Sequence, residues 1–218
     1  MSLVDVIEAE GGRVTFARFM ELALRHPVLG YYSRVDRLLR HGGDFSTAPA
    51  LSPFFNRTLA RLVTELVDAS LAESATKETA PTVVPTLAST AAPTAGRPGM
   101  VELGGGEGHL AEGILRYWDC ERPELRERVA YRIAEVGGRL KERQAKVVEP
   151  FAAAGWDVGW GGDLAEASAG TRPVVIMGNE FLDAIPVHLL GIEGGVLREV
   201  YVQVAPQSLV QTWGDVSD

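Results

Sequence analysis

The sequence predicts an α/β protein with a doubly wound, mostly parallel sheet, preceded by a helical extension at its N-terminus. Two observations predict this class. Beyond residue 99, short apolar strands alternate with segments of helical periodicity, which is typical of a parallel sheet with crossover helices. Before residue 72, the regular patterns are helical. The expected strands are 100–103, 129–136, 156–160, 174–177 and 197–204, and the expected helices between them are 110–118, 139–148 and 181–189.

Two helices are expected in the N-terminal part. Thr15 is typical of an N-cap before the amphipathic run Phe16–Arg25, which Pro27 ends. Ser52 and Pro53 predict a second helix start, and apolar residues follow at helical spacing to about residue 71. We therefore expect a helical cap segment over residues 1–72.

The composition changes sharply after the second helix. From residue 69 to residue 98, Ala, Thr, Ser and Pro dominate and the periodicity disappears. Such a segment buries too little apolar surface to offset the entropy lost on ordering. We expect a flexible insertion at 73–98, which separates the cap segment from an α/β core at 99–218.

Composition excludes several classes of function. The formal net charge of −8 disfavours non-specific binding to nucleic acid. The single cysteine, Cys120, excludes a disulfide within the chain, and no Cys/His cluster has the spacing of a zinc site. The N-terminus lacks the features of a signal or transit peptide, and no apolar stretch is long enough to span a membrane. We expect a cytoplasmic protein without metal, nucleic acid or membrane insertion.

A glycine-rich turn, Gly104 to Gly108, joins an expected strand to an expected helix. Glycine is needed where φ is positive or where the backbone touches a ligand, and cofactors bind at this turn in open α/β sheets. The dinucleotide spacing Gly-x-Gly-x-x-Gly fails, because His109 occupies the third position. The pattern Glu102-x-Gly104-x-Gly106-x-Gly108 resembles motif I of class I methyltransferases, whose cofactor is S-adenosyl-L-methionine.

Three acidic residues could complete a cofactor site around this turn. Glu102 suits the ammonium group of the cofactor. Glu135, at the end of the next strand, is placed to accept both ribose hydroxyls. Asp163 could accept a hydrogen bond from the adenine amino group. Structural alternatives stay open: a surface turn for the glycines, a solvated strand end for Glu135 and an N-cap for Asp163.

A second polar group follows the apolar strand at 174–177, which we expect to be buried on both faces. Asn179, Glu180 and Asp183 come directly after it, where many methyltransferases hold the methyl acceptor. Polar groups beside a buried strand need partners. The alternative is that Asn179 caps the next helix while Glu180 and Asp183 lie at its positive end. The two interpretations are compatible.

Several segments in order resemble the MidA-like family, which includes the mitochondrial complex I assembly methyltransferase. The matching segments are Pro27-x-x-Gly30-Tyr31-Tyr32, Gly43-Asp44-Phe45-x-Thr47-Ala48-Pro49, Val101-Glu102-Leu103-Gly104, Glu135-Val136 with Leu140 and Gln144, and Asn179-Glu180-Phe181-x-Asp183-Ala184-x-Pro186-Val187. The resemblance implies a sheet of the class I methyltransferase type, with N-terminal helices that help to cover the site.

The resemblance also implies a reaction and a substrate. It implies direct methyl transfer from S-adenosyl-L-methionine to an arginine of a protein, which in mitochondrial members is linked to respiratory complex I. Asn179, Glu180 and Asp183 would then be the catalytic residues, since carboxylates pair bidentately with a guanidinium group. Asp44 and Thr47 would approach the cofactor pocket.

The chain departs from the family pattern at several positions. Gly105, Glu107 and His109 stand where the family has Pro, Arg and Thr, while Ala50 and Asn56 replace an acidic residue and a glycine. Family members also continue past residue 218, so we expect a sheet that is incomplete at its C-terminal edge. Two other hypotheses stay open: a catalytically inactive assembly or scaffold protein that retains the fold, and an NAD(P)-dependent oxidoreductase.

Overall fold

The computed structural model describes residues 1–33, 47–77 and 96–217. The chain divides into two compact units: Phe45–Glu180, here called the parallel unit, and Met1–Asp44 with Phe181–Asp218, the antiparallel unit. The limits of these two units differ from those of the expected cap segment, insertion and α/β core. The limits of those three expected segments stay a prediction. Most of the expected insertion lies outside the described residues.

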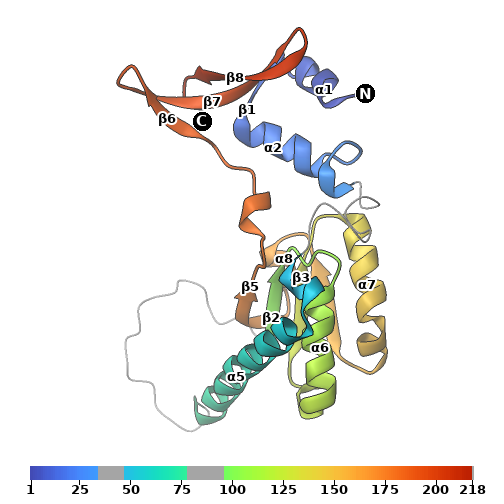
Figure 1. Ribbon diagram of the computed structural model, residues 1–218. Helices are drawn as coiled ribbons and strands as arrows, with labels where there is room; N and C mark the ends of the chain where they lie inside the picture. Colours follow the sequence, from blue (N-terminus) through green and yellow to red (C-terminus); the bar gives the residue numbers. More distant parts are fainter. Residues whose placement is uncertain (34–46, 78–95, 218) are drawn as a thin grey trace. The chain divides into compact units, whose positions relative to one another are not determined.

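The parallel unit is built on a four-stranded sheet in the order β4-β3-β2-β5. Strands β2, β3 and β5 of this sheet are labelled in Figure 1. Its strands are β2 Arg97–Leu103, β3 Ala130–Ala134, β4 Asp157–Gly161 and β5 Thr171–Met177. All neighbours are parallel, which confirms the predicted fold class. The register places Leu103 beside Ala134 and Ala134 beside Gly161. The segments that follow β2, β3 and β4 therefore begin at one edge of the sheet.

Three helices pack on one face of this sheet and a short helix packs on the other. The first face carries α5 Pro53–Lys77, α6 His109–Glu121 and α7 Gly138–Ala153, over a core that includes Val63, Ile114, Trp118, Tyr131 and Ile133. The second face carries α8 Leu164–Ala167, which packs through Ala167 on Val101 and Ala134. The smaller elements are α4 Ala48–Leu51 and a 3-10 helix, η2, at Pro123–Leu125. The helix that was expected to end near residue 71 extends to Lys77.

A buried hydrogen bond joins α5 to α6 and gives a test of this packing. The indole Nε1 of Trp118 donates to Thr64 Oγ1 at 2.9 Å, and both residues are buried. Thr64→Val keeps the shape but leaves this N–H without an acceptor, so we expect the free energy of unfolding to fall by about 1–3 kcal/mol. Thr64→Ser keeps the hydroxyl and is the control. Equal stability of the two variants in urea denaturation would contradict the prediction.

The expectation that β5 is buried on both faces is wrong. Val175 is buried, but Ile176 is 51% exposed. Ile176 pairs in register with Val101, so its side chain lies on the same face of the sheet as Val101, which packs against α8 through Ala167. In addition, β5 is at one end of the strand order.

The antiparallel unit is organised around one long strand. β7 Val196–Ala205 pairs antiparallel with β1 Arg13–Thr15, β6 Leu190–Glu193 and β8 Ser208–Gly214. Helices α1 Leu3–Ala9 and α2 Phe16–Arg25 complete a small core of Ile7, Val14, Leu22 and Val202. The predicted strand at 197–204 is therefore present, but its assignment to the parallel sheet is wrong because its partners are these three antiparallel strands.

In the antiparallel unit, the predicted cap of α2 is present, but the helix predicted after β5 is not. Thr15 caps α2 as predicted, with its side chain accepting from Arg18 N at 3.1 Å. The helix expected at 181–189 is only a 3-10 turn, η3 Leu182–Ala184, and a second such turn, η1, forms at Tyr31–Ser33. The Nδ1 atom of His188 lies 2.6 Å from Oε1 of Glu199. Burial alone would raise the pKa of Glu199, but hydrogen bonds from Ser217 and His188 lower it.

Candidate functional site

The glycine-rich turn between β2 and α6 adopts a backbone that favours glycine. Gly104, Gly106 and Gly108 have φ angles of 65°, 51° and 92°. These values lie in the left-handed region, where an L side chain is strained. A Cβ at Gly106 would meet no atom of the described residues within 4 Å, so among these residues one side of the turn is open. The turn can therefore bring its backbone against a ligand, which is the property that S-adenosyl-L-methionine would need.

Two glycines of the turn also allow close packing against neighbouring elements. A Cβ at Gly105 would lie 2.8 Å from Cγ2 of Ile133, and a Cβ at Gly108 would lie 3.3 Å from Cα of Gln144. The absence of side chains here lets the turn lie directly on β3 and α7. This packing places Gln144 directly against the backbone of the turn.

Glu135 follows β3 and is only 7% exposed. Its Oε1 atom accepts a hydrogen bond from Gly137 N at 2.8 Å, and its Oε2 atom accepts one from Gln144 Nε2 at 3.2 Å. Each carboxylate oxygen has a second lone pair, so the group retains capacity for two further donors. That capacity matches the two ribose hydroxyls expected from the sequence.

Gln144, on α7, connects the two predicted parts of the site. It is fully buried, and its Nε2 atom donates to Gly106 O at 2.9 Å as well as to Glu135. Its Oε1 atom accepts from Nε1 of Trp160, on β4, at 2.9 Å. From the sequence, Gln144 was noted only as part of the family resemblance, without a role at the site. A signal was present, because Gln144 is the polar member of a buried stripe with Leu140, Val148 and Phe151.

Glu102 is 3% exposed and lies on the sheet face that α5, α6 and α7 cover. Its Oε2 atom accepts a hydrogen bond from the hydroxyl of Tyr131 at 2.7 Å. Burial raises the pKa of Glu102 to about 7; the Tyr131 hydrogen bond opposes this rise, and the charge of Glu135 adds to it. The expected contact with a cofactor ammonium group stays a prediction.

The remaining cofactor candidates differ in their surroundings. Asp163 is the N-cap of α8 and accepts from Glu166 N at 2.8 Å, so the capping interpretation is confirmed, and the exposed side chain is compatible with the predicted adenine contact. Thr47 precedes α4 and makes no capping hydrogen bond with its side chain. Asp44 lies outside the described residues.

The acceptor candidates fall at the boundary of the two units. Asn179 and Glu180 end the parallel unit, and Asp183 belongs to η3 of the antiparallel unit. The interpretation of Asn179 as a helix cap is wrong, because Phe181 is the N-cap of that 3-10 turn. Among the described residues, Glu180 is the one non-glycine residue with positive φ, at 51°. Such strain costs about 1–3 kcal/mol and is concentrated at functional sites.

Two residues of the turn region that depart from the family pattern, Glu107 and His109, interact with each other, and Glu107 also interacts with α7. Glu107 Oε1 accepts from Nη1 of Arg143 at 2.7 Å, and its Oε2 atom lies 3.2 Å from Nε2 of His109. Both partners are partly exposed, so these pairs contribute little to stability. The acidic residue at 107 is therefore accommodated by charge pairing.

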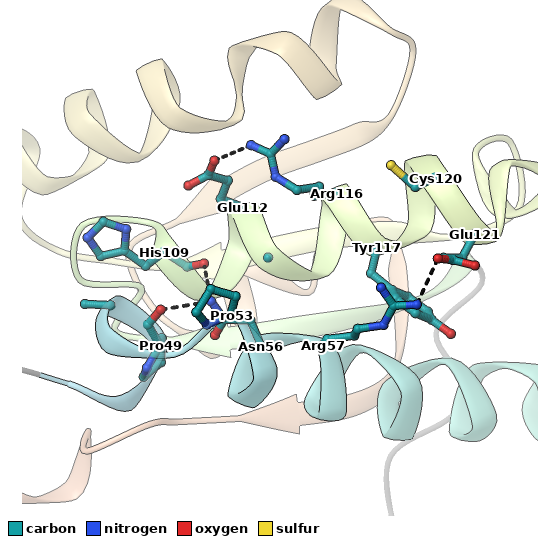
Figure 2. A pocket seen from close by; sticks show the side chains of 12 residues that line it. Pro49, Pro53, Asn56, Arg57, His109, Glu112, Arg116, Tyr117, Cys120 and Glu121 are labelled. Carbon is teal, nitrogen blue, oxygen red and sulfur yellow. Dashed lines mark hydrogen bonds and ion pairs between the residues drawn. The ribbon is translucent and has the colours of Figure 1, made fainter.

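A separate groove of about 520 Å³ lies between α5 and α6 (Figure 2). His109 and Asn56 line one end of it, and Asn56 Nδ2 donates to Pro49 O at 2.9 Å. The arginines along its walls are paired with carboxylates: Arg57 with Glu121 at 3.0 Å and Arg116 with Glu112 at 2.5 Å. These internal pairs leave no arginine of the groove uncompensated.

Over the described ranges, no helix combines the length and apolar character needed to cross a membrane.

Comparison with known proteins identifies a family for most of the chain. The model of an S-adenosyl-L-methionine-dependent methyltransferase family matches residues 80–218. A crystal structure of a COG1565 superfamily member from Burkholderia thailandensis, bound to S-adenosyl-homocysteine, superposes with a TM-score of 0.67 at 29% identity. That match covers 99% of this chain and 49% of the other chain. A native structure of a COG1565 protein from the same organism matches with the same TM-score at 32% identity.

Curated relatives with arginine methyltransferase names are also similar. The mitochondrial protein arginine methyltransferase NDUFAF7 of Danio rerio is 26% identical over 90% of this chain, and that of Mus musculus is 28% identical over 90%. The match covers 45% and 44% of these relatives, so the chain spans under half of their length. The mitochondrial names overturn the expectation of a cytoplasmic location.

Proposed function

The chain belongs to the S-adenosyl-L-methionine-dependent methyltransferase family, and on this premise we propose that it transfers a methyl group from that cofactor to an arginine side chain of a protein. One observation carries the proposal. Gly106 of the turn and Glu135 are held by the same amide, that of Gln144. A carboxylate with free lone pairs therefore lies beside an open glycine turn, which is an arrangement suited to a ribose next to a close-lying backbone.

Roles follow for the residues around the turn. Glu135 accepts the ribose hydroxyls, while Gly104, Gly106 and Gly108 allow the backbone to approach the ligand. We assign Glu102 to the cofactor ammonium group and Asp163 to the adenine amino group, with Asp44 and Thr47 entering from the preceding segment. When bound, S-adenosyl-L-methionine supplies an electrophilic methyl group on its sulfonium. The chain contributes positioning and exclusion of water.

Asn179, Glu180 and Asp183 are the proposed acceptor residues. Carboxylates orient a guanidinium by charge-assisted, bidentate hydrogen bonds. The strained backbone of Glu180 supports this role, because backbone strain of this kind is concentrated at functional sites. The names of the curated relatives support a protein arginine as the acceptor. A subunit of respiratory complex I as that protein is the finer proposal, and it rests on the family resemblance.

Calorimetric titration with S-adenosyl-L-methionine tests cofactor binding. We expect Glu135→Ala to weaken binding by about 1.5–3 kcal/mol, since it removes two charge-assisted hydrogen bonds. Glu124→Ala, at an exposed 3-10 turn, is the matched control and should leave binding unchanged. Failure of the unaltered chain to bind, or tighter binding of NAD(P), would overturn the proposal. Binding without transfer of labelled methyl to arginine peptides would favour a scaffold protein.

Two substitutions of Glu180 distinguish the effect of its strained backbone from the role of its carboxylate. Glu180→Gly removes the penalty of a positive φ, so we expect the free energy of unfolding to stay equal or to rise by up to about 1 kcal/mol. Methyl transfer to an arginine peptide should fall at least tenfold in Glu180→Gly and in Glu180→Gln, because both lack the charge that pairs with a guanidinium. Full activity of both variants, measured by labelled methyl transfer, would remove Glu180 from the site.

A further inference from the structure

We propose that Gln144 is a positioning residue, which holds the carboxylate of Glu135 in one orientation beside the glycine turn and so prepares it to bind the ribose hydroxyls. This inference rests on the proposed function. Gln144 touches Gly106, Glu135 and Trp160, and it lies on none of the segments that the sequence analysis assigned to the cofactor.

The orientation of the Gln144 amide is determined by its partners. The Trp160 indole nitrogen can only donate, so the atom 2.9 Å from it must be the amide oxygen. The amide nitrogen then faces Gly106 O and Glu135 Oε2, which are both acceptors. The reverse orientation would place donor against donor and acceptor against acceptor. The network therefore has one satisfied state.

The position of Gln144 leaves the amide little freedom to move. The residue is fully buried in the second turn of α7. Gly108 lets the turn approach so closely that a Cβ there would lie 3.3 Å from Cα of Gln144. An apolar residue could fill this space, but it would leave Gly106 O and one oxygen of Glu135 without a donor. We infer that the amide is present for those two acceptors.

The consequence for Glu135 is a fixed carboxylate plane. Gly137 N holds one oxygen at 2.8 Å, and Gln144 Nε2 holds the other at 3.2 Å. With both oxygens held, the free lone pairs point in defined directions. With only the Gly137 contact, the carboxylate can rotate, and the ribose must then order it on binding, which weakens affinity.

A comparison of two probes tests the role. Affinities of the full chain for S-adenosyl-homocysteine and for its 2′,3′-dideoxy analogue are measured by calorimetry. We expect Gln144→Leu to weaken the affinity for S-adenosyl-homocysteine about tenfold. The affinity for the dideoxy analogue should weaken less than about twofold, because the analogue has no ribose hydroxyls to donate to Glu135. In a chain that already carries Glu135→Ala, Gln144→Leu should weaken the binding of S-adenosyl-homocysteine by less than about a further twofold. Equal weakening of both probes, or none, would overturn the role.

A second variant guards against a folding defect in the first. Trp160→Phe keeps an aromatic ring but removes the donor that orients the Gln144 amide, so we expect the same probe selectivity with a smaller loss of about threefold. Unchanged affinity for both probes in this variant would count against the network. If the unaltered chain binds neither probe, the proposed function itself fails; if it binds them and Gln144→Leu changes nothing, only the present inference fails.

Discussion

Replacement of Gly161 by alanine is expected to lower the free energy of unfolding by about 3 kcal/mol. A Cβ at this position, at the end of β4, would lie 2.1 Å from the backbone nitrogen of Ala167 and 2.6 Å from its Cα. These atoms belong to α8 and cannot turn aside as a side chain can. The helix would have to move, and Gly161 O would move with the strand end, where it accepts from Glu135 N at 3.0 Å.

The neighbouring glycine is a matched control for this change. A Cβ at Gly162 would meet Oε2 of Glu166 at 2.9 Å, which is the end of a flexible side chain. We expect Gly162→Ala to cost less than about 1 kcal/mol in urea denaturation. If the two variants were equally stable, the close approach of β4 and α8 would not be a constraint on the fold.

A second large effect is expected at Glu102, and it depends on pH. Burial raises the pKa of this carboxyl to about 7, against 4.5 for the ordinary group. The folded protein therefore holds the proton more tightly than the unfolded chain. The contribution of protonated Glu102 to the stability of the fold is fully present below pH 4.5 and is lost as the pH rises through 7. The difference of pKa corresponds to about 3 kcal/mol.

Glu102→Gln removes this titration while it keeps an oxygen for the Tyr131 hydroxyl. At pH 8 we expect the variant to be more stable than the unaltered chain by up to about 3 kcal/mol, reduced by the cost of an unpaired amide N–H. Near pH 4 the two proteins should be nearly equal. Urea denaturation at intervals from pH 4 to pH 8 measures the difference in stability, and a difference that does not change with pH would show that folding does not raise the pKa of Glu102.

Features set by neighbouring residues could be predicted from the sequence. Thr15 caps α2 because its hydroxyl reaches Arg18 N in the next turn, and the alternation of strands and helices identified β2, β3 and β4 within a few residues. The three glycines of the turn were recognised because a strand that leads directly into a helix needs a left-handed backbone. Each of these features depends on a short stretch of chain.

Features set by distant residues could not be predicted in the same way. The pattern of alternation identified the strand at β7, but its partner β1 is far away in the sequence, as in the pairing of Arg13 with Gln203. The exposure of Ile176 follows from the sparse covering of one sheet face, which periodicity does not reveal. Gln144 was quoted without a role because its three partners come from β4, from the turn and from the end of β3.

The discontinuous antiparallel unit has a consequence for the order of folding during synthesis. In the described part of the chain β1 pairs with β7, with Val14 opposite Val202, so this pairing cannot form until the ribosome has passed residue 202. Strands β2 to β5 have by then emerged and can form their own sheet, because the pairings described for them are with one another. Contacts of such high sequence separation form slowly. Nascent chains that stall before β7 should therefore protect the strands β2 to β5 from proteases, while the amino-terminal segment is still cleaved.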